Sequence, residues 1–148
     1  MNATPMVQLL EDIVALLSAP SASAASLSRL LGPVREKYTG SGYDLAPVDP
    51  RLAKAWIGIR EEPGMTEVPT DVEIDFAPTS LLELVELDRA LGPRRSLPPA
   101  PNGPLYKVVY DRDRGSSTHK ATLFATLDGP PDQPNVVVQR LLIRRDTR

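Results

Sequence analysis

Two nine-residue segments that lie 60 residues apart limit what this chain can fold into. Residues 27–35 (LSRLLGPVR) and residues 87–95 (LDRALGPRR) align without gaps and share six identical positions. Each segment has leucines at helical spacing and then Gly-Pro, which is a typical helix stop. Further along, residues 54–59 can be placed on residues 120–125. We therefore predict a tandem duplication of one unit made of a helix and strands.

The spacing of prolines and of apolar residues suggests three parts that share one core. The chain has 16 prolines in 148 residues, which divides it into short elements. We expect an N-terminal amphipathic helix in residues 1–22, a first unit in residues 23–78 and a second unit in residues 79–148. Units of this size bury little surface alone, so a common core is expected.

Helix signals occur in three places. Apolar residues recur at helical spacing from Met6 to Leu17, with Thr4 as the capping residue. A second helix is expected from about residue 23 to residue 31. A third is expected to begin at residue 79 or 80, because Ser80 and Glu83 have capping-box spacing, and to end before Gly92.

Alternation of apolar and polar residues predicts five strands, in residues 54–60, 71–76, 105–112, 119–127 and 136–145. Residues 93–104 hold five prolines and are expected to form an extended connector. Strands that alternate this clearly need a cover on one side only. The predicted fold class is therefore α+β, with an antiparallel sheet and two to three helices packed on one face.

The composition excludes several classes of protein. The chain has no cysteine, so disulfides, thiolate zinc sites and cysteine nucleophiles are impossible. No apolar stretch approaches the roughly 20 residues that span a bilayer, so no membrane insertion is expected. The apolar run at residues 13–17 follows Glu11 and Asp12, which a signal peptide would not carry there. We expect a cytoplasmic location, with a periplasmic or secreted one as the alternative.

Charge is distributed unevenly along the chain. Residues 44–88 carry a net charge of −8 and residues 89–148 a net charge of +6, although the total is −2. The two regions could pair within one fold, join two copies as a homodimer, or steer a charged partner. The basic residues are scattered among few aromatics, so no nucleic acid is expected as a partner.

Three carboxylates, Asp71, Glu73 and Asp75, share one face of a predicted strand. They could form a solvated face paired with Lys54 and Arg60, or a contact surface for a basic partner. A straight strand spreads ligands too widely for a hard cation, so no metal site is expected.

Two aromatic residues, Trp56 and Phe124, fall on the polar faces of their strands. Exposed aromatics are favoured anchors at protein interfaces, so we count both as candidate partner-binding residues. A loop that covers them is the alternative interpretation.

His119 is the only histidine and follows a hydroxyl-rich stretch at residues 115–118, with Asp111 and Asp113 nearby. A Ser-His-Asp arrangement could be drawn from these residues, but the chain has no Gly-x-Ser-x-Gly turn. We expect a structural histidine near the surface, no catalytic residue and no cofactor.

A helix that ends in Leu-Gly-Pro and is followed by an antiparallel meander, with the whole unit doubled, resembles the beta-lactamase inhibitor protein family and the related small outer-membrane-assembly lipoprotein domains. The resemblance covers about residues 23–146 and rests on element order and on residues 30–33 and 90–93. It implies a sheet whose outer face grips another protein. It transfers no individual binding residue, and the disulfides of that inhibitor family have no counterpart here.

The leading hypothesis is a non-enzymatic module that binds another protein through its sheet face, as an inhibitor or as the immunity partner of a toxin. One alternative is a small pocket protein that acts as an enzyme or ligand binder around His119. Another is a subunit of a secretion or envelope assembly, docked through its opposed charges.

Overall fold

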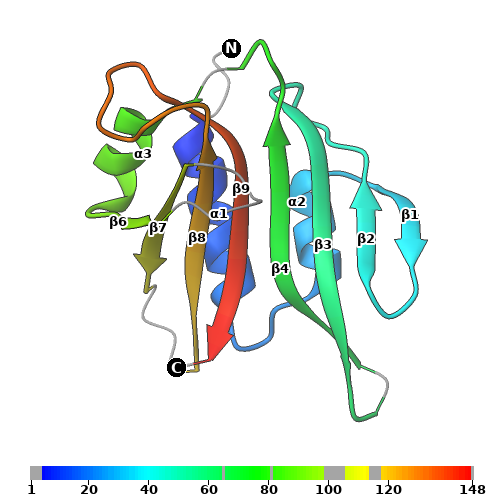
Figure 1. Cartoon of the computed structure of the whole chain (residues 1–148). Coiled ribbons are helices and arrows are strands. Elements are labelled where there is room, and N and C mark those ends of the chain that lie inside the picture. Colours follow the sequence, from blue (N-terminus) through cyan, green and yellow to red (C-terminus); the bar gives the residue numbers. More distant parts are fainter. Residues whose placement is uncertain (1–4, 65, 81, 99–105, 114–117, 148) are drawn as a thin grey trace.

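The computed structural model describes residues 5–64, 66–80, 82–98, 106–113 and 118–147, which form three helices and a nine-stranded antiparallel sheet (Figure 1). The helices are α1 (Met6–Ser18), α2 (Ala24–Leu31) and α3 (Leu84–Leu91). The strands are β1 (Val34–Tyr38), β2 (Gly42–Leu45), β3 (Leu52–Glu62), β4 (Thr66–Phe76), β5 (Leu82–Glu83), β6 (Arg95–Leu97), β7 (Lys107–Arg112), β8 (His119–Leu127) and β9 (Val137–Thr147). The predicted α+β class is confirmed.

The strand order divides the sheet into two similar halves. It runs β1-β2-β3-β4-β9-β8-β7-β6, and the short β5 pairs with β9. One half is α2 followed by β1–β4, and the other is α3 followed by β6–β9. The last strands of the two halves, β4 and β9, pair at the centre. The segments at residues 27–35 and 87–95 contain the ends of α2 and α3, but a common origin of the two halves stays a prediction.

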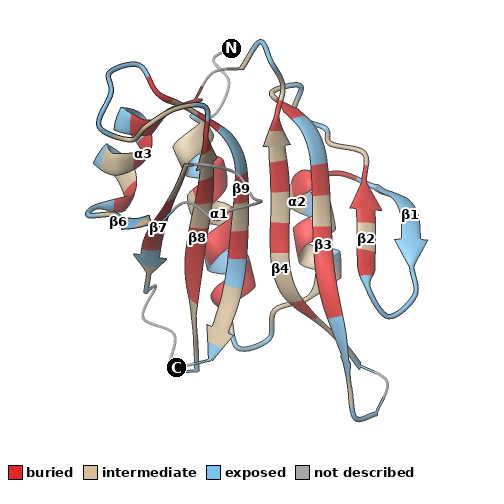
Figure 2. Cartoon of the chain, in the orientation of Figure 1, coloured by how far each residue is buried: buried red, intermediate tan, exposed pale blue. Residues whose placement is uncertain are grey.

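One hydrophobic core joins the two halves. Helix α1 contacts β4, β8 and β9, so it lies over the seam between the halves (Figures 1 and 2). Its residues Leu10, Ile13, Val14 and Leu17 have no exposed surface. They belong to the same buried cluster as the inward residues of both halves of the sheet.

Polar contacts fix the middle and the C-terminal end of α1 to the second half. Arg112 of β7 donates from Nε to Glu11 Oε1 at 2.9 Å. Arg145 of β9 donates from Nε to the Leu17 carbonyl at 2.9 Å and from Nη2 to the Ala19 carbonyl at 3.0 Å. A cation at a helix C-terminus satisfies carbonyls that have no partner within the helix.

The predicted helix starts had different outcomes. Helix α2 begins at Ala24, next to the predicted start at about residue 23, and Ser23 caps it because its Oγ accepts from the Ser26 N–H at 3.2 Å. The predicted start of the third helix at residue 79 or 80 is wrong. Leu82 and Glu83 instead pair with β9, and the helix begins at Leu84. Strand pairing is favoured over an earlier helix start because it buries Leu82 against the core. Thr4 lies outside the described residues.

The sequence pattern did not predict four short strands. Strand β1 is exposed along its whole length, so it carries no alternation. Strands β2, β5 and β6 have two to four residues, too few for a period to be visible. Strand β6 falls within the predicted connector, of which residues 99–104 lie outside the described residues.

Candidate functional site

The side of the sheet opposite the helices is the candidate functional surface, and we call it the open face. Antiparallel partners share a face, and the register places Trp56, Glu73, Leu142 and Phe124 in one row across β3, β4, β9 and β8. In the described part of the chain, α1, α2 and α3 all lie on the other side (Figure 1). Residues whose side chains belong to the open face are mostly half-buried or exposed.

All five predicted partner-binding residues lie on the open face. Glu73 lies in the row that holds Trp56 and Phe124. Asp71 and Asp75 are its two neighbours on the same face of β4, one before it and one after it. The structure therefore brings together on one surface the acidic strand and the two aromatics that the sequence pattern singled out.

Trp56 forms part of an aromatic hollow over β1–β3. Its ring lies 5.7 Å from the Tyr38 ring, at an interplanar angle of 53°. Gly42 makes room for it, since a Cβ there would lie 2.6 Å from the indole. The hollow has a volume of about 440 Å³ and is lined by Arg35, Tyr38, Ser41, Asp44, Lys54 and Trp56. Tyr38 was missed by the sequence interpretation because β1 shows no alternation.

A guanidinium borders this hollow. Arg35 donates from both Nε and Nη2 to Asp44 Oδ2, and this hydrogen bond is the main cause that raises the pKa of Arg35. The Arg35 side chain is nevertheless 66% exposed, whereas Asp44 is nearly buried. Asp44 therefore positions a cation at the rim of the aromatic hollow, where a partner can reach it.

The acidic strand is partly neutralised by β9. Arg140 Nε lies 2.7 Å from Asp75 Oδ1 and 3.4 Å from Glu73 Oε1, and its hydrogen bond to Asp75 is the main cause that raises the pKa of Arg140. Asp71 accepts from the Thr70 hydroxyl at 2.7 Å. Arg140, from the basic end of the chain, is thus the ionic partner of Asp75 and Glu73.

Phe124 lies in a second hollow, over β6–β9. The Arg144 guanidinium lies 5.0 Å from the centre of the Phe124 ring, and it is also bound to Asp146 at 2.7 Å. This hollow has a volume of about 530 Å³, and its lining includes Arg95, Asp111, Lys120, Phe124 and Arg144. Each half of the open face therefore offers an aromatic ring beside exposed cations.

His119 is separated from Asp111. The register places Asp111 on the open face, where Arg95 lies 3.2 Å away, and His119 on the opposite face. Burial and the positive charge of Arg145 lower the pKa of His119, so the imidazole is neutral at neutral pH. Asp111 is therefore not brought together with His119, as a Ser-His-Asp arrangement would require. Residues 115–117 lie outside the described residues.

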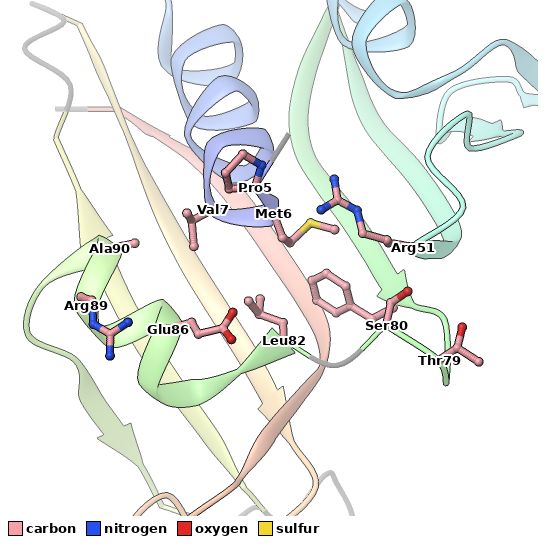
Figure 3. A pocket seen from close by; sticks show the side chains of 11 residues that line it. Pro5, Met6, Val7, Arg51, Thr79, Ser80, Leu82, Glu86, Arg89 and Ala90 are labelled. Atoms are coloured by element: carbon pink, nitrogen blue, oxygen red, sulfur yellow. The ribbon is translucent and has the colours of Figure 1, made fainter. Parts of the chain in front are cut away.

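A pocket of about 800 Å³ lies on the helix side, between the start of α1, α3 and the end of β4 (Figure 3). Met6, Phe76 and Leu82 supply apolar walls, and Arg51, Glu86 and Arg89 supply charge. Sequence patterns missed this pocket because its walls come from distant segments. His119 lies near the other end of α1, beside Arg145.

Arg51 is held at the pocket by Asp49. Asp49 accepts from the Arg51 backbone N–H at 2.9 Å and from Arg51 Nη2 at 2.7 Å. The side-chain hydrogen bond to Arg51 is the main cause that lowers the pKa of Asp49. A carboxylate with a depressed pKa stabilises the fold above its unfolded pKa of about 3.9, and this contribution is lost as the pH falls through the folded pKa.

We therefore expect that the free energy of unfolding depends less on pH at acid pH in Asp49→Asn than in the wild type. Urea unfolding between about pH 5 and pH 2 should show a smaller loss of stability in Asp49→Asn than in the wild type. Asp132→Asn, in the exposed β8–β9 loop, serves as the control and should keep the wild-type slope. Equal slopes in all three proteins would show that the Asp49–Arg51 pair contributes nothing.

Searches for a metal site and for relatives gave no further assignment. Within the described ranges, no group of three His, Cys, Asp or Glu residues is arranged to hold a metal ion. No helix among those residues is long and apolar enough to cross a membrane. A scan of protein-family models, a search of curated proteins and a search of solved structures each return no match to this chain.

Proposed function

We propose that this chain is a non-enzymatic protein-binding module that uses the open face of its sheet, as an inhibitor or as the immunity partner of a toxin. The observation that carries the proposal is the pair of hollows on that face, each with an aromatic ring beside exposed arginine or lysine. Aromatic and arginine side chains in hollows are the residues that contribute most to protein interfaces.

Two further features support the proposal. A sheet with eight strands in one continuous order offers a broad, rigid surface, and such surfaces suit pre-organised binding. The resemblance to the beta-lactamase inhibitor protein family implies the same use of the outer sheet face. Each half of the fold is a helix followed by four antiparallel strands.

The test begins with the immobilised chain, which captures its partner from an extract of the organism that encodes the chain. The captured partner is then purified. A single protein that binds the purified chain at a one-to-one ratio by calorimetry is the expected result. Binding that is unchanged after both Trp56→Ala and Phe124→Ala would contradict the open face as the binding surface.

The acidic strand should act mainly on the rate of association. We expect the triple variant Asp71→Asn, Glu73→Gln, Asp75→Asn to lose less than about tenfold in affinity, with most of the change in the association rate and its salt dependence. The reason is that Arg140 already neutralises part of this charge. Stopped-flow association at low and high salt is the measurement. A triple variant with wild-type rates at low salt would remove the acidic strand from the interface.

Small-ligand binding is a second candidate, favoured by the pocket in Figure 3. An apolar interior with two arginines at its border suits a ligand with an apolar body and an anionic group. Native mass spectrometry of the purified chain should then detect a bound small molecule, and Ala90→Trp, which fills the pocket, should remove it. This candidate differs from an enzyme built around His119, because His119 does not line the pocket.

A further inference from the structure

The two halves of the open face carry opposite charge. The half formed by β1–β4 has six acidic and three basic side chains, and the half formed by β6–β9 has two acidic and five basic ones. The first set is Glu36, Asp44, Glu62, Asp71, Glu73 and Asp75 with Arg35, Lys54 and Arg60. The second is Arg95, Lys107, Lys120, Arg140 and Arg144 with Asp111 and Asp146. The net charges of the halves are therefore −3 and +3.

The charges and aromatics are also placed at matching distances from the seam between β4 and β9. Trp56 lies one strand beyond β4, and Phe124 lies one strand beyond β9, in the same row. Asp71 pairs directly with Arg144, and Asp75 with Arg140, across the seam. A half-turn about an axis along the seam therefore exchanges the positions of Trp56 and Phe124, of Asp71 and Arg144, and of Asp75 and Arg140.

We propose that two copies of this chain associate face to face, about a two-fold axis that runs parallel to the strands over the β4–β9 seam. This arrangement sets Trp56 opposite the partner's Phe124, and Asp71 opposite the partner's Arg144. It places the acidic half of each copy over the basic half of the other. A two-fold axis perpendicular to the strands would instead set acidic half on acidic half, at a cost in repulsion.

The open face is large enough for such a dimer. Eight strands about 4.8 Å apart, with about 7.5 residues on average at 3.3 Å per residue, cover roughly 950 Å² per copy. Stable interfaces bury about 800 Å² per partner. The hollows of about 440 and 530 Å³ face each other in this arrangement, so we expect a close contact at the seam and ordered water at the flanks.

The dimer does not rest on the proposed function. Self-association and binding of a foreign protein use the same face, so the dimer competes with that complex. It is tested on the purified chain alone, and its failure would leave the proposed function as it stands.

Charge reversal tests the predicted contacts. Sedimentation equilibrium should show a monomer–dimer equilibrium for the wild type at concentrations up to the order of 100 μM. Asp71→Arg and Arg144→Asp each set like charges opposite each other and should weaken the dimer by at least about tenfold. The double variant again sets opposite charges against each other between the two copies, and should recover most of the affinity. Circular dichroism confirms that each variant is folded.

Cross-linking tests the arrangement. The chain has no cysteine, so single cysteines can be introduced without interference. Facing sheets lie about 10 Å apart, too far for a disulfide, so a short bifunctional maleimide is the probe. A mixture of Trp56→Cys and Phe124→Cys chains should cross-link, whereas Trp56→Cys alone should not, because its two copies lie roughly 17 Å apart. A wild type that stays monomeric, a double variant as weak as the single ones, or a cross-link in Trp56→Cys alone would each overturn the proposal.

Discussion

Replacing Gly32 by alanine is expected to destabilise the protein by about 3 kcal/mol or more, whereas Gly92→Ala should cost only about 1 kcal/mol. Both glycines follow a helix in a Leu-Gly-Pro sequence, and both have positive φ, +149° for Gly32 and +81° for Gly92. A Cβ on Gly32 would lie 1.9 Å from the Ala46 carbonyl oxygen, whereas Gly92 has open space.

The two losses differ because Gly32, besides ending its helix, lies in close contact with the backbone of another segment, and Gly92 does not. The segment after β2 lies against the end of α2, with Val48 N–H bound to the Leu31 carbonyl at 3.0 Å and Ala46 N–H bound to the Pro33 carbonyl at 2.8 Å. A methyl group on Gly32 must push this segment away and break both bonds. Urea unfolding of the two variants measures the difference, and equal losses would show that the close approach does not constrain the fold.

Trp56→Ala is expected to reduce the affinity for the captured partner by at least about 30-fold, which is the loss typical of a buried aromatic anchor. The indole lies over Gly42 and against Tyr38, so its orientation is fixed before binding. A ring that is already ordered loses little entropy in a complex. Phe124→Ala should also weaken binding, because it removes the ring that supports Arg144.

Val85→Ala is the matched control for Trp56→Ala. Val85 is also apolar and is 53% exposed, but it lies on α3, away from the open face. Biolayer interferometry with the purified partner should show wild-type affinity for Val85→Ala. If Val85→Ala weakened binding as much as Trp56→Ala did, the partner would contact the helix side.

The long strands were predictable because each has one buried and one open side. In β4, Val72, Ile74 and Phe76 face the core and alternate with the three carboxylates, as the sequence pattern indicates. The same alternation placed Trp56 and Phe124 on the side away from the core. Strand β1 could not be found in this way, because five exposed residues leave no pattern.

Long-range contacts account for most of what the sequence did not reveal. The charge of Asp75 is compensated by Arg140, which is 65 residues away in the chain. That partner follows only from the pairing of β4 with β9, and local spacing carries no signal for it. The helix-side pocket depends in the same way on α1, α3 and the end of β4 meeting in space.

Oxidative footprinting of the chain, free and bound to its captured partner, tests the open face most directly. Hydroxyl radicals modify exposed aromatic and methionine side chains, and mass spectrometry locates the changes. At a concentration low enough to keep the free chain monomeric, the partner should protect Tyr38, Trp56 and Phe124 and leave Met6, in the helix-side pocket, as reactive as before. Protection of Met6 with full reactivity of Trp56 would contradict the account, because it would place the partner on the helix side.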